Sequence, residues 1–129
     1  MEYLTVEEVI EINKIVLREI RVRKADQPRV LADWKLEEGL ELVKKTQGDI
    51  YDKAVAVVTE LARGHAFASG NRRTAYVTAK VFLERNGAKM RVKHDPNVLQ
   101  GIREGFYSKK EIKEWLKGNA IKEFLRGQS

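Results

Sequence analysis

The 129-residue chain contains no cysteine. Disulfides, thiolate nucleophiles and cysteine-bound zinc are therefore excluded, and any covalent or metal chemistry must use oxygen and nitrogen groups. The sequence also lacks an apolar run near the roughly 20 residues needed to span a bilayer. It does not open with basic residues followed by an apolar stretch, as a secretory leader would. We therefore expect a cytoplasmic protein that does not enter a membrane.

The length and composition suit one domain over residues 1–129. Apolar residues make up 43% of the chain, which is enough for one core, and no repeat or linker divides the sequence. The 25 Lys and Arg exceed the 19 Asp and Glu, giving a net charge of +6. This excess favours anionic partners, such as nucleotides, nucleic acids or acidic proteins, without choosing among them.

Apolar residues repeat at helical spacing in the first half of the chain. Thr5 and Glu8 form a capping box that begins a helix over Val6 to Ile20. A second, short helix is marked by apolar residues at 36, 40 and 43 and ends near Gly48. Between these two helices, the basic stretch Arg21 to Asp33 has no clear period, which predicts a loop with some extended structure.

The second half of the chain continues this helical pattern. Asp49 caps a helix from Ile50 to Gly64, and Thr74 to Arg85 is apolar on nearly all sides, as expected of a central helix. Asp95-Pro96 begins a helix toward Tyr107, and Ser108 with Glu111 begins another that stops at Gly118. A short extended segment at Lys89 to Lys93 and a last helical turn at residues 121–125 complete the chain. The sequence predicts an all-α bundle of six or seven helices around a central apolar helix.

The segment from His65 to Ala75 carries the residues best suited to chemistry. It joins two helices, and the N–H groups that begin a helix lack intrahelical acceptors and lie at the positive end of its dipole. Gly70 permits close backbone approach, Asn71 adds an amide, and Arg72 and Arg73 can form charge-assisted bonds to phosphate. His65 can accept a proton near neutral pH. The pattern is that of a phosphate-binding turn beside a base.

Simpler interpretations were weighed for each of these residues. The two arginines could be an exposed helix start, although the positive end of a helix dipole disfavours them unless an anion is present. For His94, an ordinary surface or partner-satisfied position is favoured. Phe67 is expected to anchor the loop in the core. Packing is favoured over base stacking for the other large aromatic residues, which are Trp34, Trp115, Phe106 and Tyr107.

The loop resembles the signature of the Fic/Doc family, H-x-F-x-(D/E)-(G/A)-N-x-R. Five positions match this pattern, namely His65, Phe67, Gly70, Asn71 and Arg73. Similarity to the shorter Doc (death-on-curing) toxin branch extends to Tyr3–Glu8, Tyr51–Ala54, Arg73–Ala75 and Phe82–Gly87. The resemblance covers most of the chain and is weakest over residues 21–48 and after Gly101.

The resemblance implies an enzyme that moves AMP, or in the Doc branch phosphate, from ATP or another nucleoside triphosphate to a Ser, Thr or Tyr hydroxyl of a target protein. It also implies roles for individual residues. His65 would be the general base, Gly70, Asn71 and Arg72 would donate bonds to the phosphates, and Arg73 would pair with phosphate charge. Such transfer depends mainly on positioning and on stabilising charge as it develops.

Two departures from the family pattern bear on this activity. Ser69 replaces the acidic residue that holds Mg²⁺ in the family, and a neutral hydroxyl is a poorer ligand for this hard cation. We therefore expect weakly held Mg²⁺. Arg72 occupies the position where AMP-transferring members usually have glycine, and Tyr76 replaces the second arginine of their motif. Both features resemble the Doc branch and favour phosphate transfer over AMP transfer.

The sequence also lacks the family's inhibitory motif, (S/T)-x-x-x-E-(G/N), so the resemblance implies control by a separate antitoxin-like partner. Two other functions remain open. One is a degenerate relative that binds a nucleotide or a partner protein without catalysis, which Ser69 suggests. The other is a nucleic-acid-binding domain that uses the basic segments at residues 21–24 and 89–93. We favour it least, because no recognition helix or stacking platform accompanies these segments.

Overall fold

The computed structural model describes residues 1–20 and 28–125, and these form six α-helices. The helices are α1 (Val6–Ile20), α2 (Asp33–Lys45), α3 (Ile50–Gly64), α4 (Asn71–Arg85), α5 (Pro96–Glu104) and α6 (Lys109–Leu116). The β-pairing in this part of the chain is one isolated antiparallel bridge between Val30 and Phe67. The predicted all-α class is confirmed. Within the described residues, no helix is long and apolar enough to cross a membrane.

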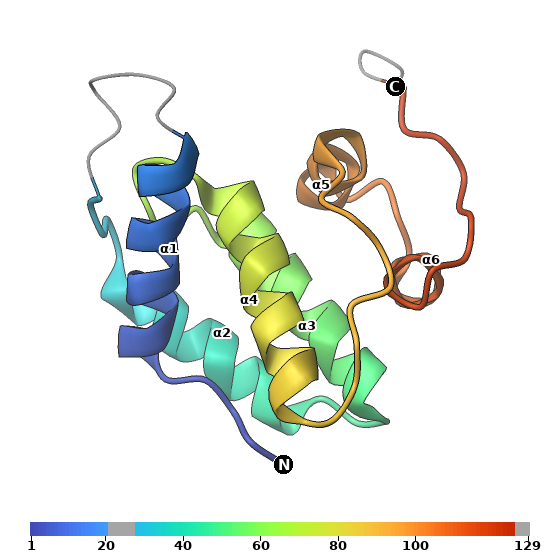
Figure 1. Ribbon diagram of the computed structural model, residues 1–129, viewed down its shortest axis with the longest axis horizontal. Coiled ribbons are helices and arrows are strands. Elements are labelled where there is room, and N and C mark those ends of the chain that lie inside the picture. The colour runs from blue at the N-terminus through green and yellow to red at the C-terminus, as the bar shows by residue number, and fades with distance from the viewer. Residues whose placement is uncertain (21–27, 126–129) are drawn as a thin grey trace.

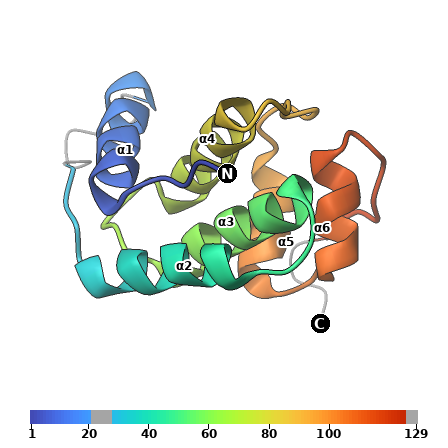
Figure 2. The same cartoon turned by 90° about the horizontal axis from the view of Figure 1, so that it is seen from below.

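Helices α3 and α4 lie side by side in the middle of the bundle, with α1 and α2 on one side and α5 and α6 on the other (Figure 1). Helix α4 contacts α1, α3 and α5, as predicted for a central helix. Helix α3 shares this central position, because it contacts α2, α4, α5 and α6. Seen from below, α2 packs along the outer side of α3 (Figure 2). The core between the helices is formed by aliphatic side chains together with Phe67, Phe82 and Trp115.

Four helices begin at the side-chain caps that the sequence predicts. Thr5 and Glu8 exchange backbone-to-side-chain hydrogen bonds of 3.0 and 3.2 Å at the start of α1. Capping boxes also begin α3 at Asp49 and α6 at Ser108, and the Asp95 carboxylate caps α5. Because a cap supplies acceptors for N–H groups that the helix cannot satisfy, it fixes the starting residue from local sequence alone.

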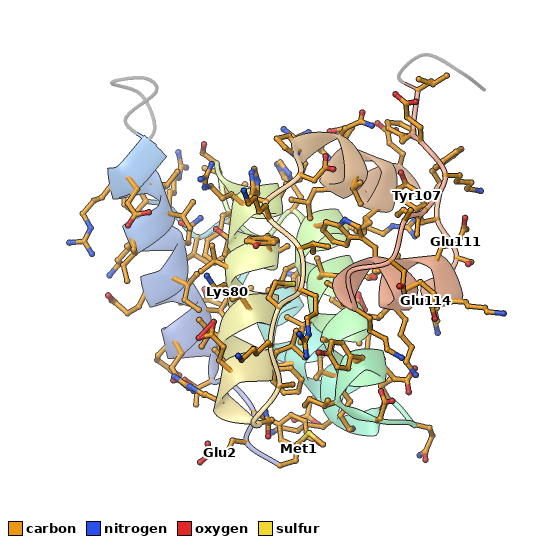
Figure 3. The ribbon with its side chains drawn as sticks, turned by 45° about the vertical axis from the view of Figure 1, so that its right-hand side comes forward. Met1, Glu2, Lys80, Tyr107, Glu111 and Glu114 are labelled. Carbon is orange, nitrogen blue, oxygen red and sulfur yellow. The ribbon has the colours of Figure 1, made fainter. Side chains whose placement is uncertain are left out.

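The N-terminal segment is tied to the C-terminal end of α4, where Met1 and Glu2 lie in Figure 3. The Glu2 N–H donates to Asn86 Oδ1 (2.7 Å), and Asn86 Nδ2 donates to the Glu2 carbonyl (2.9 Å). One turn into α1, Glu8 forms an ion pair with Arg85 of α4. The hydrogen bond from Arg85 and the Thr5 N–H lower the pKa of the Glu8 carboxyl to about 2. These contacts fix α1 against α4.

Helix α2 ends at Lys45, earlier than the predicted end near Gly48. The cause is a lysine from α3. Lys53 is 7% exposed, and its ammonium donates to the carbonyl groups of Val43 (3.2 Å), Lys44 (3.0 Å) and Thr46 (2.8 Å). A cation is favoured at the negative end of a helix, and here it satisfies carbonyls that lack helical partners. A tertiary contact therefore sets this helix end, and the local sequence does not reveal it.

Other boundaries differ in the second half of the chain. Helix α4 begins at Asn71 rather than Thr74, and α5 ends at Glu104, where Gly105 adopts a left-handed conformation (φ 78°). The predicted last turn at residues 121–125 is wrong, because this segment is not helical. It packs without regular structure through Phe124, whose carbonyl accepts a 2.8 Å bond from Asn97 Nδ2. The hydroxyl of Tyr107, labelled in Figure 3, donates to the Lys122 carbonyl (3.0 Å).

The predictions for the large aromatic residues are partly confirmed and partly wrong. Trp115 and Tyr107 are buried as expected, whereas Trp34 is 58% exposed, so its assignment to the core was wrong. Phe106 lies at the surface, with its ring against Phe124. Of the two basic segments, residues 21–24 lie outside the described part of the chain, as does most of the predicted loop that contains them, and residues 89–93 form neither helix nor strand.

Candidate active site

The loop between α3 and α4 is held in place by backbone pairing with the segment before α2. The Leu31 N–H donates to the Ala66 carbonyl (2.7 Å), and the Ala68 N–H donates to the Arg29 carbonyl (3.0 Å). Phe67 is 2% exposed and anchors the loop in the core, as predicted. His65 ends α3 in a left-handed conformation (φ 51°, ψ 46°), which is uncommon for a residue with a side chain. The loop therefore presents an exposed imidazole from a fixed backbone.

The Asn71 side chain closes the loop from the first residue of α4. Its Oδ1 accepts from the Phe67 N–H (3.1 Å), and its Nδ2 donates to the Phe67 carbonyl (2.8 Å). The same Nδ2 lies 3.5 Å from His65 Nδ1. This distance is beyond the usual range, so the amide constrains the imidazole tautomer only weakly. Because both ends of the amide bind Phe67, Asn71 shapes the loop more directly than it faces a ligand.

A second asparagine, which the sequence analysis did not select, supports the loop from α1. Asn13 is 1% exposed, and its Nδ2 donates to the Ser69 carbonyl (3.0 Å) and to Thr74 Oγ1 (3.1 Å). The signal was present in the sequence, because position 13 lies on the apolar stripe of the first helix. A polar residue at a buried position needs partners, and these bonds supply them.

The N-terminus of α4 is open toward the loop. Gly70 precedes the helix in a left-handed conformation (φ 76°), and the first N–H to find a helical acceptor is that of Thr74, which donates to the Gly70 carbonyl (2.9 Å). No side chain of the described residues caps this end, and its first turn contains no acidic residue. A Cβ at position 70 would lie 3.0 Å from Leu17 Cδ2, so glycine is favoured here by conformation and by space. The open N–H groups provide a site for an anion.

A cavity of about 650 Å³ brings most of the predicted site residues together. Its lining comprises His65, Ala68, Ser69, Gly70, Asn71, Arg72, Arg73, His94, Pro96, Asn97, Gln100 and Arg103. In the described part of the chain, three arginines and two histidines line it, and no carboxylate does. Among the residues that the structure describes, none of these arginines forms a salt bridge. The cavity is therefore a concentration of uncompensated positive charge, which favours a polyanionic ligand.

The lining does not fit a magnesium ion. Mg²⁺ prefers anionic oxygen ligands, whereas the described lining residues offer it neutral oxygens beside arginine side chains. No group of three or more acidic, histidine or cysteine side chains gathers anywhere within residues 1–20 and 28–125. The replacement of an acidic residue by Ser69 is thus not compensated by a carboxylate from another element among these residues.

His94 is half-buried and lies in the wall of this cavity. The rings of His94 and Tyr76 pack edge-to-face, with 5.5 Å between their centroids. The Tyr76 hydroxyl donates to the carbonyl of Val92, which belongs to the same segment as His94 (2.5 Å). Burial, and then the charges of Arg73 and Arg72, lower the pKa of His94. Tyr76, which stands at the position of a second arginine in the AMP-transfer motif, therefore holds the segment that carries His94.

The sequence analysis also missed Asn97, Gln100 and Arg103, which line the cavity from α5. They recur at three-residue spacing and so share one face of the helix. A polar helix face of this kind normally indicates solvent exposure, and only the packing of α5 beside the N-terminal end of α4 turns it toward the site (Figure 1).

This fold and site define a small helical protein in which an uncapped helix N-terminus lies beside an exposed imidazole. The model of the Fic/DOC family matches residues 3–83, more than half of the chain, and the chain belongs to this family. The match covers α1 to most of α4 and contains the whole His65 loop, whereas α5 and α6 lie beyond it.

One curated relative is similar over part of the chain. Toxin Doc of Mycolicibacterium smegmatis (strain ATCC 700084 / mc(2)155) is 44% identical over 46 residues, which are 36% of this chain and 35% of that protein. The similarity thus spans about a third of the relative's length. It agrees with the resemblance to the Doc branch that the loop sequence suggests.

Proposed function

We propose that the protein transfers phosphate from a nucleoside triphosphate to a hydroxyl group of a target protein. The observation that supports this most directly is the cavity itself. It combines the exposed imidazole of His65, the open N-terminus of α4 and three arginines, and none of the described lining residues carries a carboxylate. A triphosphate matches this charge, and family membership connects the loop with group transfer.

The proposed reaction is an in-line displacement. The target hydroxyl oxygen attacks the γ-phosphorus while its proton passes to the His65 imidazole. The bond from that phosphorus to the β–γ bridging oxygen breaks, and the nucleoside diphosphate leaves with the electron pair. Arg72, Arg73 and the N–H groups that follow Gly70 stabilise the negative charge on the phosphate oxygens. Because the residues present do not fit a magnesium ion, no step of this scheme is assigned to one.

Three roles inside the site follow from the contacts. His65 Nε2 makes no hydrogen bond with the residues described here, so this nitrogen is available to the target hydroxyl. Asn71 acts as a positioning residue, because its amide holds the loop through Phe67. Arg73 is exposed and unpaired within the described residues, so it can pair with phosphate.

The test is a transfer assay with ATP labelled separately at its α and γ phosphates, incubated with a cell lysate. Label from the γ position on a protein is the expected result, and label from the α position alone would instead indicate AMP transfer. His65→Ala should lower transfer by ~10²–10⁴-fold while nucleotide binding persists, because a general base acts in the chemical step. Arg73→Ala should weaken both ATP binding and transfer.

Retained activity in His65→Ala would overturn the proposed mechanism. Nucleotide binding with no transfer of either label would instead favour the second candidate, a relative that binds without catalysis. Two observations favour this candidate, namely Ser69 at the metal-ligand position and the lack of a carboxylate among the lining residues that the structure describes.

We further infer that a separate antitoxin-like protein controls the activity. The relative named Toxin Doc supports this inference, as does the lack of the family's inhibitory motif in this sequence. Such a partner should abolish transfer when it is added in equimolar amount. If transfer by the isolated protein is already blocked by its own chain, as truncation variants would reveal, the inference is wrong.

A further inference from the structure

The cavity has a second wall, built by helix α5 and the segment before it. We define the α5 wall as His94, Pro96, Asn97, Gln100 and Arg103. This wall lies outside residues 3–83, so the family match assigns no role to it. Residues 96, 100 and 103 follow the three- and four-residue spacing of one helix face, which places the Arg103 side chain on the face that borders the cavity.

The two amide nitrogens of the α5 wall, which are the groups that could donate to an anion, already have partners. Asn97 Nδ2 donates to the Phe124 carbonyl (2.8 Å), and Gln100 Nε2 donates to the Glu104 carboxylate (2.5 Å). The nearby Asp95 carboxylate accepts from the N–H groups of Asn97 and Val98, as the cap of α5, and it does not line the cavity. Arg103 and His94 are thus the groups of this wall that remain for a ligand.

Positive charge from α4 and from α5 lies near these two groups. Arg72 and Arg73 of α4 act on His94 and lower its pKa, after burial, while Asp95 opposes them. Arg103 adds a third guanidinium and forms no salt bridge with any residue that the structure describes. Like charges gathered around one cavity repel each other, and a bound polyanion would relieve this repulsion.

We propose that the α5 wall binds the phosphate chain of the nucleotide, with Arg103 and His94 facing the phosphate oxygens across the cavity from the N-terminus of α4. Arg103, together with Arg72 and Arg73, then supplies positive charge where the family uses a metal ion. This proposal rests on the proposed function for the identity of its ligand, a nucleoside triphosphate. It predicts that binding does not require a divalent cation.

The experiment is calorimetric titration of the full chain with ATP and with inorganic triphosphate, both in EDTA and at one ionic strength. Wild-type protein should bind both ligands. Arg103→Ala should weaken both by roughly tenfold or more, as expected for the loss of a charge-assisted contact. Arg103→Lys should recover part of the loss, because it restores the charge without the planar fork. His94→Gln should also weaken both ligands, by a smaller factor.

Arg91→Ala is the matched control, because Arg91 is exposed and does not line the cavity. It removes the same charge and should change each affinity by less than about twofold, because an exposed charge that makes no contact with the ligand is screened by salt. Thermal unfolding of each variant shows whether it is folded.

Four results would overturn the proposal. Wild-type protein could fail to bind triphosphate without a divalent cation, or Arg103→Ala could bind both ligands normally. Arg91→Ala could weaken binding as much as Arg103→Ala, which would indicate a general charge effect. Arg103→Ala could weaken ATP alone, which would place Arg103 against the base or ribose. Binding that depends on Arg103 without any transfer of label would uphold this proposal and contradict the proposed enzymatic function.

Discussion

Replacement of Asn13 by alanine tests how the site loop is held. The substitution removes the donor that bonds the Ser69 carbonyl at 3.0 Å and Thr74 Oγ1 at 3.1 Å. A buried acceptor left without a donor costs about 1–3 kcal/mol. The bond to Thr74 is buried and the bond to the Ser69 carbonyl is partly buried, so we expect a loss of about 1–3 kcal/mol in the free energy of unfolding. This is a large part of the roughly 5–15 kcal/mol typical of a domain.

Urea unfolding followed by circular dichroism measures this loss directly. A double-mutant cycle with Thr74→Val isolates one of the two bonds. Because removing both partners of a buried hydrogen bond costs less than removing one, the double variant should be more stable than the sum of the single effects predicts. Lys14→Ala, an exposed neighbour on the same helix, should change stability by less than about 0.5 kcal/mol. A loss below about 1 kcal/mol for Asn13→Ala would refute this account of the loop.

Three further predictions address the metal, the packing and the pH dependence. Ser69→Asp should make transfer depend more strongly on Mg²⁺ than in wild type, because it adds an anionic oxygen to the cavity, whereas Ser69→Asn should not. The measurement is the transfer rate of each protein against Mg²⁺ concentration. Strong activation of the wild-type protein by Mg²⁺ would contradict the prediction. Gly101→Ala should lower the free energy of unfolding, measured in urea, by about 1–3 kcal/mol, since its Cβ would lie 2.5 Å from the Tyr107 ring. Gly64→Ala is the control and should not lower it, because a Cβ at position 64 meets nothing within 4 Å. Glu8 has an ordinary pKa of 4.5, lowered to about 2 in the fold, so its contribution to stability is complete above pH 4.5 and is lost as the pH falls toward 2. Glu8→Gln should therefore lose less stability over that interval, and equal losses in both proteins would show that this carboxyl is not responsible.

The helix starts were predictable because their determinants are local. Each capping residue lies within three positions of the N–H group that it binds, so Thr5, Asp49, Asp95 and Ser108 mark their helices in the sequence itself. The end of α2 was not predictable in this way. It depends on Lys53, which reaches back from the next helix, and sequence periodicity carries no information about such a contact.

The candidate site also has a local part, which the sequence predicts, and a part that depends on how the helices pack. His65, Gly70, Asn71, Arg72 and Arg73 are close in sequence, and the turn that groups them is local. Their arrangement in one cavity agrees with the sequence interpretation, although their roles stay predictions. The contributions of α1 and α5 required the fold, because helix packing alone brings Asn13 and Arg103 to the loop. Trp34 shows the converse, since an aromatic residue on an amphipathic helix was assigned to the core and lies at the surface.

The exchange of a carboxylate for arginines has a consequence for the rate of the proposed reaction. Arginine side chains in the cavity wall attract the phosphates of substrate and product alike, and binding that is equal in the ground and transition states raises affinity without raising kcat. Acceleration must then come from groups whose contacts strengthen as charge develops, namely His65 and the open N–H groups of α4. These groups act through their fixed position, and Asn71 and Asn13 hold the loop in that position. On the proposed mechanism, replacement of Asn71 or Asn13 lowers kcat more than it weakens nucleotide binding. Replacement of Arg103 instead weakens nucleotide binding more than it lowers kcat.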